Sequence, residues 1–315
     1  MYDTINLWLS KEIIKGGNLF EVAKNLTNLT EHQNMNNEYY VSGTLGDNYN
    51  VNISNNGVSF KGSLAKYYLN DNFHTLTRSD TKRAIEKMAD EIHLPIADAK
   101  VNRIDFAQNF IMDYKPEAYY NYLGDSQFYN RLTQPNSLYY SNGLRTKLFY
   151  NKIAEGSTKK SKLSGYKLPE IWRDKNILRY ELRYTSRIAK QFELDKMDCK
   201  TLSDEKFYMN LFDKWQSEYK AINKNNLINF DMVNMKTPKD FFEQLILMKL
   251  NEIGQNNALL IVEDLRSKNT FEKPEYYSRL KNDIKEKCNK PDITIKSDLM
   301  AELDNKINNA KKFYR

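Results

Sequence analysis

A tyrosine, a lysine and a glutamate follow one another as Tyr-x-Lys-x-x-Glu at residues 150 to 155, in the strand-like stretch LFYNKIAE. A phenol is a nucleophile that can hold a phosphoryl group covalently, but its ordinary pKa of about 10 means that it needs help to react at neutral pH. A neighbouring lysine can stabilise both the phenolate and the charge of a transition state. The chain has 22 tyrosines, so the surroundings of Tyr150 must distinguish it.

Two further strand-like stretches carry charged residues on one face. The period of two places Arg103 and Asp105 together in VNRIDFAQ, and Arg179, Glu181 and Arg183 together in ILRYELRY. Each pattern alone is also typical of a solvated strand whose charges pair across the sheet. If the strands are neighbours, carboxylates, arginines and a tyrosine converge. Carboxylates bind Mg²⁺ or Mn²⁺ and arginines complement phosphate, so the set suits phosphodiester transfer.

The first part of the chain alternates strand and helix signals. Turn residues at Gly46-Asp47 and Asn55-Asn56-Gly57 predict hairpins, and Ser79 can cap a helix that ends before Pro95. Strands are predicted at 100–112, 137–141, 146–153 and 176–185. We therefore expect an α+β fold, in which a curved antiparallel sheet with flanking helices forms the first domain.

After about residue 200 the apolar residues recur at helical spacing only. The patterns predict an α+β domain at residues 1–195 and an all-helical C-terminal domain at residues 196–315. The C-terminal helices could bind DNA, mediate self-association or contact host proteins.

The net charge of +7 and the isoelectric point near 9.0 favour a polyanionic partner. Between Arg145 and Lys190, 13 Lys and Arg stand against 4 Asp and Glu, a local excess of +9. This segment includes GSTKKSKLSGYK at 156–167, which is typical of a solvated loop or of a loop that reaches a phosphate backbone. No apolar run approaches the roughly 18 residues of a membrane span, and no cleavable leader is evident, so we expect a cytoplasmic protein. Cys199 and Cys288 fit a reducing compartment.

Four motifs occur in series: GSLAKYYLNDN at 62–72, Arg-Ile-Asp at 103–105, Tyr-x-Lys-x-x-Glu at 150–155 and Leu-Arg-Tyr-Glu-x-Arg at 178–183. Together they resemble the gene II-like replication initiator endonucleases of filamentous bacteriophages and related phage and plasmid replication proteins. The resemblance covers roughly residues 1 to 190. A more distant similarity is to the rolling-circle initiators of Gram-positive plasmids.

This resemblance implies site-specific, metal-dependent nicking and rejoining of one strand at an origin, through a 5′-phosphotyrosine. The position that matches the nucleophile is Tyr150, with Lys152 to stabilise the phenolate. It implies Mg²⁺ or Mn²⁺ held by Asp105 and Glu181, with Glu155 as a third carboxylate. Strict alternation would put Glu155 on the opposite face from Tyr150, so a bend or bulge must intervene. Otherwise Glu155 is an ordinary acid at a helix start or in a loop.

The implied partners are duplex and nicked single-stranded origin DNA, a host helicase or polymerase, and a second copy of the chain. Basic residues expected to contact DNA are Arg103, Arg179, Arg183, Lys66, Arg145 and Lys147. Tyr139, Tyr140, Tyr180 and Tyr184 are rival tyrosines, expected to pack or stack. Initiators that bind metal through a His-hydrophobe-His pair are disfavoured, because the three histidines are far apart in sequence. The alternative function is a non-catalytic origin-binding protein that recruits a replisome.

Overall fold

The structure is a computed structural model that describes residues 1–14, 18–33, 38–46, 48–160, 170–225, 236–288 and 298–313. Most of the basic stretch at 156–167 falls outside these residues. The chain forms two compact units: the first comprises Met1–Asn225 with Glu302–Arg315, and the second comprises Asn226–Ala301. Each unit is described by itself.

A ten-stranded antiparallel sheet forms the first unit, in the order β2-β3-β4-β5-β1-β6-β11-β10-β9-β8. The strands are β1 (Tyr2–Ser10), β2 (Thr27–Gln33), β3 (Tyr39–Leu45), β4 (Tyr49–Ser54), β5 (Gly57–Ser63), β6 (Lys100–Met112), β8 (Asn130–Gln134), β9 (Ser137–Ser141), β10 (Arg145–Asn151) and β11 (Asn176–Tyr184). A separate pair joins β7 (Leu123–Ser126) to β12 (Ile222–Lys224). The long strand β6 lies between β1 and β11, so it brings the two halves of the sheet together.

Helices are interspersed with these strands in the first unit: α1 (Leu64–Leu69), α2 (Arg78–Ile92), α3 (Pro116–Tyr120), α4 (Lys152–Lys160), α5 (Ile188–Gln191), α6 (Glu205–Lys220) and most of α10 (Asp298–Ala310). Thr77 caps α2 through a reciprocal capping box with Asp80. The helix then ends at His93, which has a positive φ, just before Pro95. Short 3-10 helices lie at Leu19–Asn25, Ile96–Asp98, Glu170–Trp172, Cys199–Ser203 and Lys311–Phe313.

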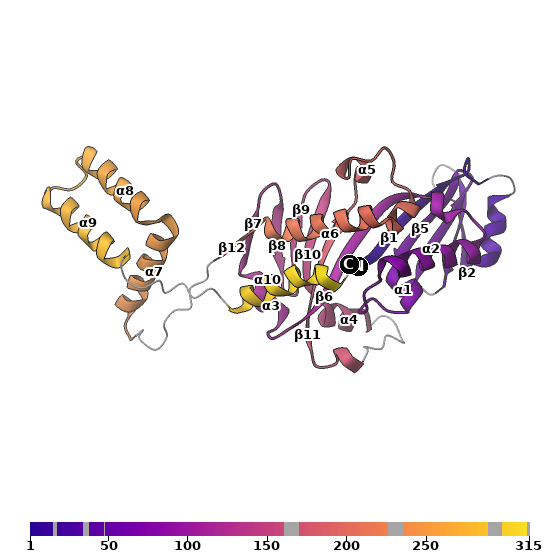
Figure 1. Cartoon of the computed structure of the whole chain (residues 1–315), viewed down its shortest axis with the longest axis horizontal. Helices are drawn as coiled ribbons and strands as arrows, with labels where there is room; N and C mark the ends of the chain where they lie inside the picture. The colour runs from indigo at the N-terminus through magenta and orange to yellow at the C-terminus, as the bar shows by residue number, and fades with distance from the viewer. Residues whose placement is uncertain are drawn as a thin grey trace. The chain divides into compact units, whose positions relative to one another are not determined.

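One face of the sheet, called here the helix face, is packed by apolar side chains and helices. Figure 1 shows α6 and α10 running across the strands around β6 and β10. Phe149 stacks on Tyr180 with ring centroids 4.5 Å apart, and Trp215 of α6 packs on Tyr180 at 4.8 Å. Over β4, Tyr67 of α1 packs edge to face on Tyr49, with ring centroids 5.7 Å apart. Aromatic burial of this kind supplies much of the stability of a core.

In its described residues, the second unit contains α7 (Pro238–Ile253), α8 (Gln255–Ser267), α9 (Glu275–Cys288) and the beginning of α10. Its small core contains Ala258, Val262, Tyr277 and Ile284. A capping box between Thr237 and Asp240, with proline at the first turn, fixes where α7 begins.

The large antiparallel sheet with helices, and the helices of the C-terminal part, agree with the sequence prediction. The division into units differs from the boundary expected at residues 195 and 196. Helix α6 buries Phe212 and Trp215 against the sheet. Helix α10 is joined to α6 by a hydrogen bond from the Tyr219 hydroxyl to Asp304. Helix α6 and most of α10 therefore belong to the first unit. Periodicity predicts that a helix has an apolar face but not which surface that face meets.

Within the described residues, no helix is both long enough and apolar enough to cross a membrane.

Candidate active site

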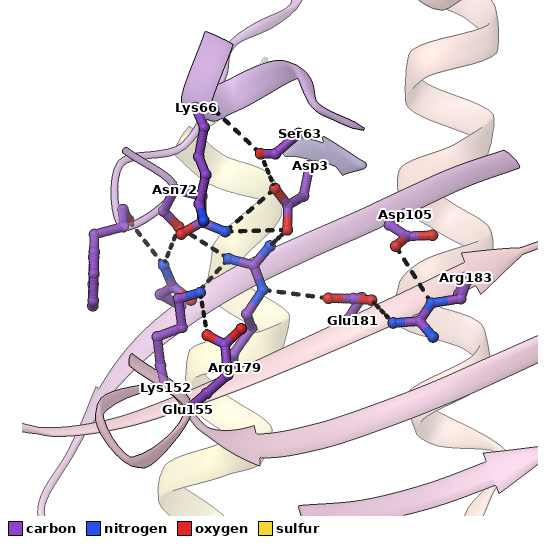
Figure 2. Close-up of polar contacts among 12 residues, drawn as sticks. Asp3, Ser63, Lys66, Asn72, Asp105, Lys152, Glu155, Arg179, Glu181 and Arg183 are labelled. Carbon is purple, nitrogen blue, oxygen red and sulfur yellow. Dashed lines mark hydrogen bonds and ion pairs between the residues drawn. The ribbon is translucent and has the colours of Figure 1, made fainter. Parts of the chain in front are cut away.

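Three carboxylates and three guanidinium groups alternate in one continuous chain of ion pairs on the face opposite the helix face, called here the site face. Their order is Asp3, Arg179, Glu181, Arg183, Asp105 and Arg103. The N–O distances are 3.5 Å from Arg179 to Glu181, 2.7 Å from Glu181 to Arg183, 3.3 Å from Arg183 to Asp105 and 2.6 Å from Asp105 to Arg103. Asp3 pairs closely with Arg179. Figure 2 shows the part of this ion-pair chain from Asp3 to Asp105.

This chain forms because three neighbouring strands contribute to it. Strand β11 pairs with β6 so that Arg183 lies opposite Asp105, and β1 lies on the other side of β6. The structure therefore brings together the five charged residues that alternation placed on strand faces at 103, 105, 179, 181 and 183. Buried charges are costly unless they are paired, and the alternation of signs gives each buried member an opposite charge.

Burial divides the chain into an inner and an outer part. Asp3, Asp105, Arg179 and Glu181 are buried. The side chains of Arg103 and Arg183 keep 29% and 28% of their surface exposed. These two guanidinium groups are the members that a phosphate arriving from solvent can reach, since a planar guanidinium can bind phosphate through two hydrogen bonds.

Arg179 is held from several sides. Its Nη1 donates to the carbonyl oxygen of Asn72 at 3.0 Å and to Oδ1 of Asn109 at 3.3 Å, besides the ion pairs with Asp3 and Glu181. Asp3, Asn72 and Asn109 were not predicted from the sequence, because each meets Arg179 across 70 or more residues. A lone aspartate in a strand such as YDTINLWLS gives no local signal of its partner.

The pKa values of the two aspartates in the ion-pair chain, Asp3 and Asp105, are shifted in opposite directions. Burial opposes ionisation of Asp3, but Arg179, Lys152 and hydrogen bonds from Ser63 and Asn72 lower its pKa to about 2. Burial and the adjacent carboxylate of Glu181 raise the pKa of Asp105 to about 7, against the pull of its arginines.

Tyr150 lies on β10 directly opposite Arg179 of β11. It is half-buried and lines a cavity of about 400 Å³, together with Ser137, Tyr139, Leu148, Glu155, Arg183 and neighbouring residues. Burial raises the pKa of Tyr150 well above 10, although the guanidinium of Arg179 lowers it. The hydroxyl is therefore protonated in the free protein, and ionisation must accompany any reaction.

Strand β10 ends at Asn151 and helix α4 begins at Lys152, so the Tyr-x-Lys-x-x-Glu motif spans a strand-to-helix junction. The side chain of Asn151 accepts hydrogen bonds from the backbone N–H groups of Ile153 and Ala154, which starts the helix. This junction is the bend predicted from the sequence if Glu155 is to lie on the same side as Tyr150. Glu155 consequently lines the same cavity as Tyr150.

Lys152 is 2% exposed and lies against the nucleophile candidate. Its Nζ is 5.8 Å from the ring centroid of Tyr150 and 2.8 Å from a carboxylate oxygen of Glu155. Burial and the nearby Arg179 lower the pKa of Lys152 to about 8. Lys152 is therefore a cation at neutral pH that loses its proton not far above it.

Asp105, Glu181 and Glu155 have the oxygen ligands that a divalent cation prefers, but their present pairing suits such a cation only in part. Arg183 stands between Asp105 and Glu181 and binds both, in the position that a shared cation would take (Figure 2). Mg²⁺ is commonly held by one or two carboxylates, with water and substrate phosphate completing its shell, so this pair is a suitable donor set once Arg183 moves aside. Glu155 pairs with Lys152 instead. Among the described residues, no three His, Cys, Asp or Glu side chains gather as metal ligands.

Two of the basic residues expected to contact DNA lie on the helix face, opposite the site face. Lys147 is fully buried on the helix face, where its Nζ contacts Glu218 of α6 and the hydroxyl of Ser126, each at 2.8 Å. Arg145 pairs with the same Glu218. The expectation that Lys147 contacts DNA is therefore corrected, because its charge is used to hold α6 on the sheet. Lys66 of α1 points toward Asn72 and Asp3 on the site face (Figure 2).

Comparison with known proteins identifies one family. The family of phage replication-associated proteins of the gene II type, defined on their N-terminal region, matches residues 1–218. The match includes every residue of the ion-pair chain and the whole Tyr150 cavity. No curated protein matches the chain.

Proposed function

The chain belongs to the family of gene II-type phage replication-associated proteins, and from this membership and the geometry around Tyr150 we propose that it nicks and rejoins one strand of origin DNA. The family indicates an initiator of replication. The observation that carries the proposal is the placement of Tyr150 in an open cavity, opposite the fixed Arg179 and against Lys152. A tyrosine that served only to pack would not need two cations beside it.

In the proposed reaction, the Tyr150 oxygen attacks the scissile phosphorus while the bond from phosphorus to the 3′ oxygen breaks. Tyr150 then carries the 5′ phosphate as a phosphodiester, and the 3′ oxygen leaves as a hydroxyl. Among the described residues that line the cavity, Glu155 is the one acid, and we assign it to take the phenolic proton and return it to the 3′ oxygen. Lys152 and Arg179 stabilise the charge that develops on the phenol and the phosphate.

Covalent capture suits an initiator. The phosphotyrosine bond preserves the energy of the original phosphodiester, so the strand can be resealed without ATP. The freed 3′ hydroxyl can meanwhile prime synthesis. Splitting the transfer into two steps is what nucleophilic catalysis provides.

We also propose that the reaction depends on a divalent cation held by Asp105 and Glu181, which would polarise the scissile phosphate. In that arrangement Arg183 leaves the space between the two carboxylates and turns toward the DNA backbone. The side chain of Arg183 keeps 28% of its surface exposed, which allows this movement.

The alternative is an origin-binding protein without catalysis, in which the acids only neutralise the arginines. The fully paired chain of charges is compatible with that function. Tyr150→Phe separates the two on supercoiled origin DNA with Mg²⁺, because it removes the nucleophilic oxygen and keeps the ring. The proposal predicts that wild type converts the supercoiled DNA to open circles and that the variant binds DNA but does not nick it. Nicking by Tyr150→Phe would overturn the proposal, as would wild type that binds without nicking.

A further inference from the structure

A second polar surface lies on the site face, away from Tyr150, over β3, β4, β5 and β1. The strands alternate strictly: Val51 and Phe60 are buried on the helix face, whereas their neighbours on the other side are at least partly exposed. Cross-strand pairing sets Ser42, Asn52, Ser59 and Trp8 in one row. A partly buried tryptophan among small polar side chains is unusual for a sheet face that is only solvated.

Trp8 borders a hollow of about 190 Å³. Its lining combines aromatic rings with side chains that donate and accept hydrogen bonds, namely Tyr39, Tyr40, Asn52, Ser54, Asn55, Asn56, Ser59 and Glu38. Tyr40 is already fixed by stacking on His32, with centroids 4.6 Å apart. Aromatic rings bind the faces of bases and asparagine amides bind their edges, so the lining matches the chemistry of an unpaired nucleobase.

The ring of Trp8 rests on Gly57 of the neighbouring strand. A Cβ atom built on Gly57 would lie 2.9 Å from the ring and 2.3 Å from the carbonyl oxygen of Leu9. Glycine at this position therefore allows the ring to lie close to the backbone, which fixes its place on the sheet.

The charge of this surface also favours a nucleic acid. Strands β3, β4 and β5 contain no Asp or Glu, and β5 contributes the exposed Lys61. Lys61 pairs across the sheet with Asn6, and Asn6 pairs in turn with Arg103. The exposed Lys100 lies opposite Trp8. Cations thus lead from the hollow to Arg103, the outer end of the ion-pair chain.

We infer that this surface, centred on Trp8 and called here the Trp8 surface, binds single-stranded DNA that flanks the nick. The inference rests on the proposed function for its substrate. Strands β1 and β10 are three positions apart in the sheet, which corresponds to about 15 Å across the strands. Along the strands, Trp8 lies opposite Lys100 of β6, whereas Tyr150 is level with Asn109 through Arg179, about 30 Å farther along. A DNA strand held at Tyr150 therefore spans roughly 33 Å to reach the hollow, which is about ten nucleotides at about 3.4 Å each. Base stacking on Trp8 requires unpaired bases, so the surface selects single strands over duplex.

The test measures the anisotropy of a fluorescein-labelled, mixed-sequence single-stranded oligonucleotide longer than about 16 nucleotides, the upper size of comparable sites. Trp8→Ala should weaken binding about 5- to 150-fold, the range expected for losing one base stack, and Trp8→Phe should retain most of the affinity. Lys61→Ala should weaken binding and reduce the salt dependence by about 0.7 in the log-log slope.

Matched controls are Phe128→Ala and Lys82→Ala, which remove an exposed aromatic ring and an exposed lysine elsewhere in the first unit. Both should bind single strands as wild type does. Unchanged single-strand affinity in Trp8→Ala, or an equal loss for the labelled duplex, would overturn the inference. A wild type that forms no adduct would refute the proposed nicking and leave the binding comparison intact.

Discussion

Tyr150 and Arg179 lie directly opposite each other on β10 and β11, and Arg179 cannot move away because Asp3, Glu181 and Asn109 all hold it. A fixed guanidinium beside a half-buried phenol is an electrostatic arrangement that exists before any substrate arrives. Such preorganised charges are the most effective way for a protein to stabilise a developing anion, since no reorganisation is needed during the reaction.

Lys152 should act as a cation during nicking. Its pKa is lowered to about 8, so the ammonium form predominates below that pH and is lost above it. We expect the single-turnover rate of adduct formation in wild type, taken relative to Lys152→Arg, to fall as pH rises through about 8. The arginine variant provides the reference because it stays charged throughout. Lys152→Ala should react about 100- to 1,000-fold more slowly. A relative rate that rises through pH 8 would show that the neutral amine acts as a base instead.

The sequence predicted the site face well where strict strand alternation governs it. Arg179, Glu181 and Arg183 fall on one face because β11 is regular from Asn176 to Tyr184. Pairing with β6 was a hypothesis, and the register now places Arg183 opposite Asp105.

Other parts of the site depend on contacts that no local pattern encodes. Asp3 meets Arg179 across 176 residues. Alternation places Lys147, three residues from Tyr150, on the opposite strand face, but its partner Glu218 lies on a helix 71 residues away and is not encoded locally. Glu155 was ambiguous because the change from period two to period 3.6 occurs within the motif itself, at Asn151.

Asp105 should titrate far from an ordinary aspartate. Its pKa of about 7 in the folded protein exceeds the unfolded value of about 3.9. Between these values the folded state keeps a proton on Asp105 that the unfolded state has lost. The contribution of Asp105 to stability therefore declines as pH rises from about 4 to about 7. Carbon-13 NMR of the carboxyl groups should show one signal with a midpoint near 7 that is absent in Asp105→Asn. If every carboxyl group titrates below about pH 5, the stated environment of Asp105 is incorrect.

Lys147 should matter for stability and not for DNA. Glu218→Gln leaves the buried ammonium group without its carboxylate, which should cost about 3–5 kcal/mol in urea unfolding. Lys147→Met should leave the affinity for single-stranded DNA within about twofold of wild type, which is less than half a kcal/mol. Lys61→Ala is the control that should lower affinity. A loss of DNA binding in Lys147→Met at unchanged stability would restore Lys147 to the DNA interface.

Metal dependence should reside in Asp105 and Glu181. EDTA should abolish covalent adduct formation and added Mg²⁺ or Mn²⁺ should restore it, whereas DNA binding should change little. Asp105→Asn should raise the Mg²⁺ concentration needed for half-maximal adduct formation, because one of two carboxylate ligands is lost. The control Glu86→Gln removes an exposed carboxylate on α2 and should leave that concentration unchanged. Full adduct formation in EDTA would exclude this cation site.

The most direct test of the central claim is to incubate the protein with supercoiled origin DNA and Mg²⁺, digest both components, and identify by mass spectrometry the peptide that remains attached to a 5′ end. We predict a nucleotide linked to Tyr150, in a peptide from the β10–α4 junction. Attachment to Tyr139, Tyr140 or another residue, or nicked DNA with a free 5′ phosphate and no peptide, would contradict the account.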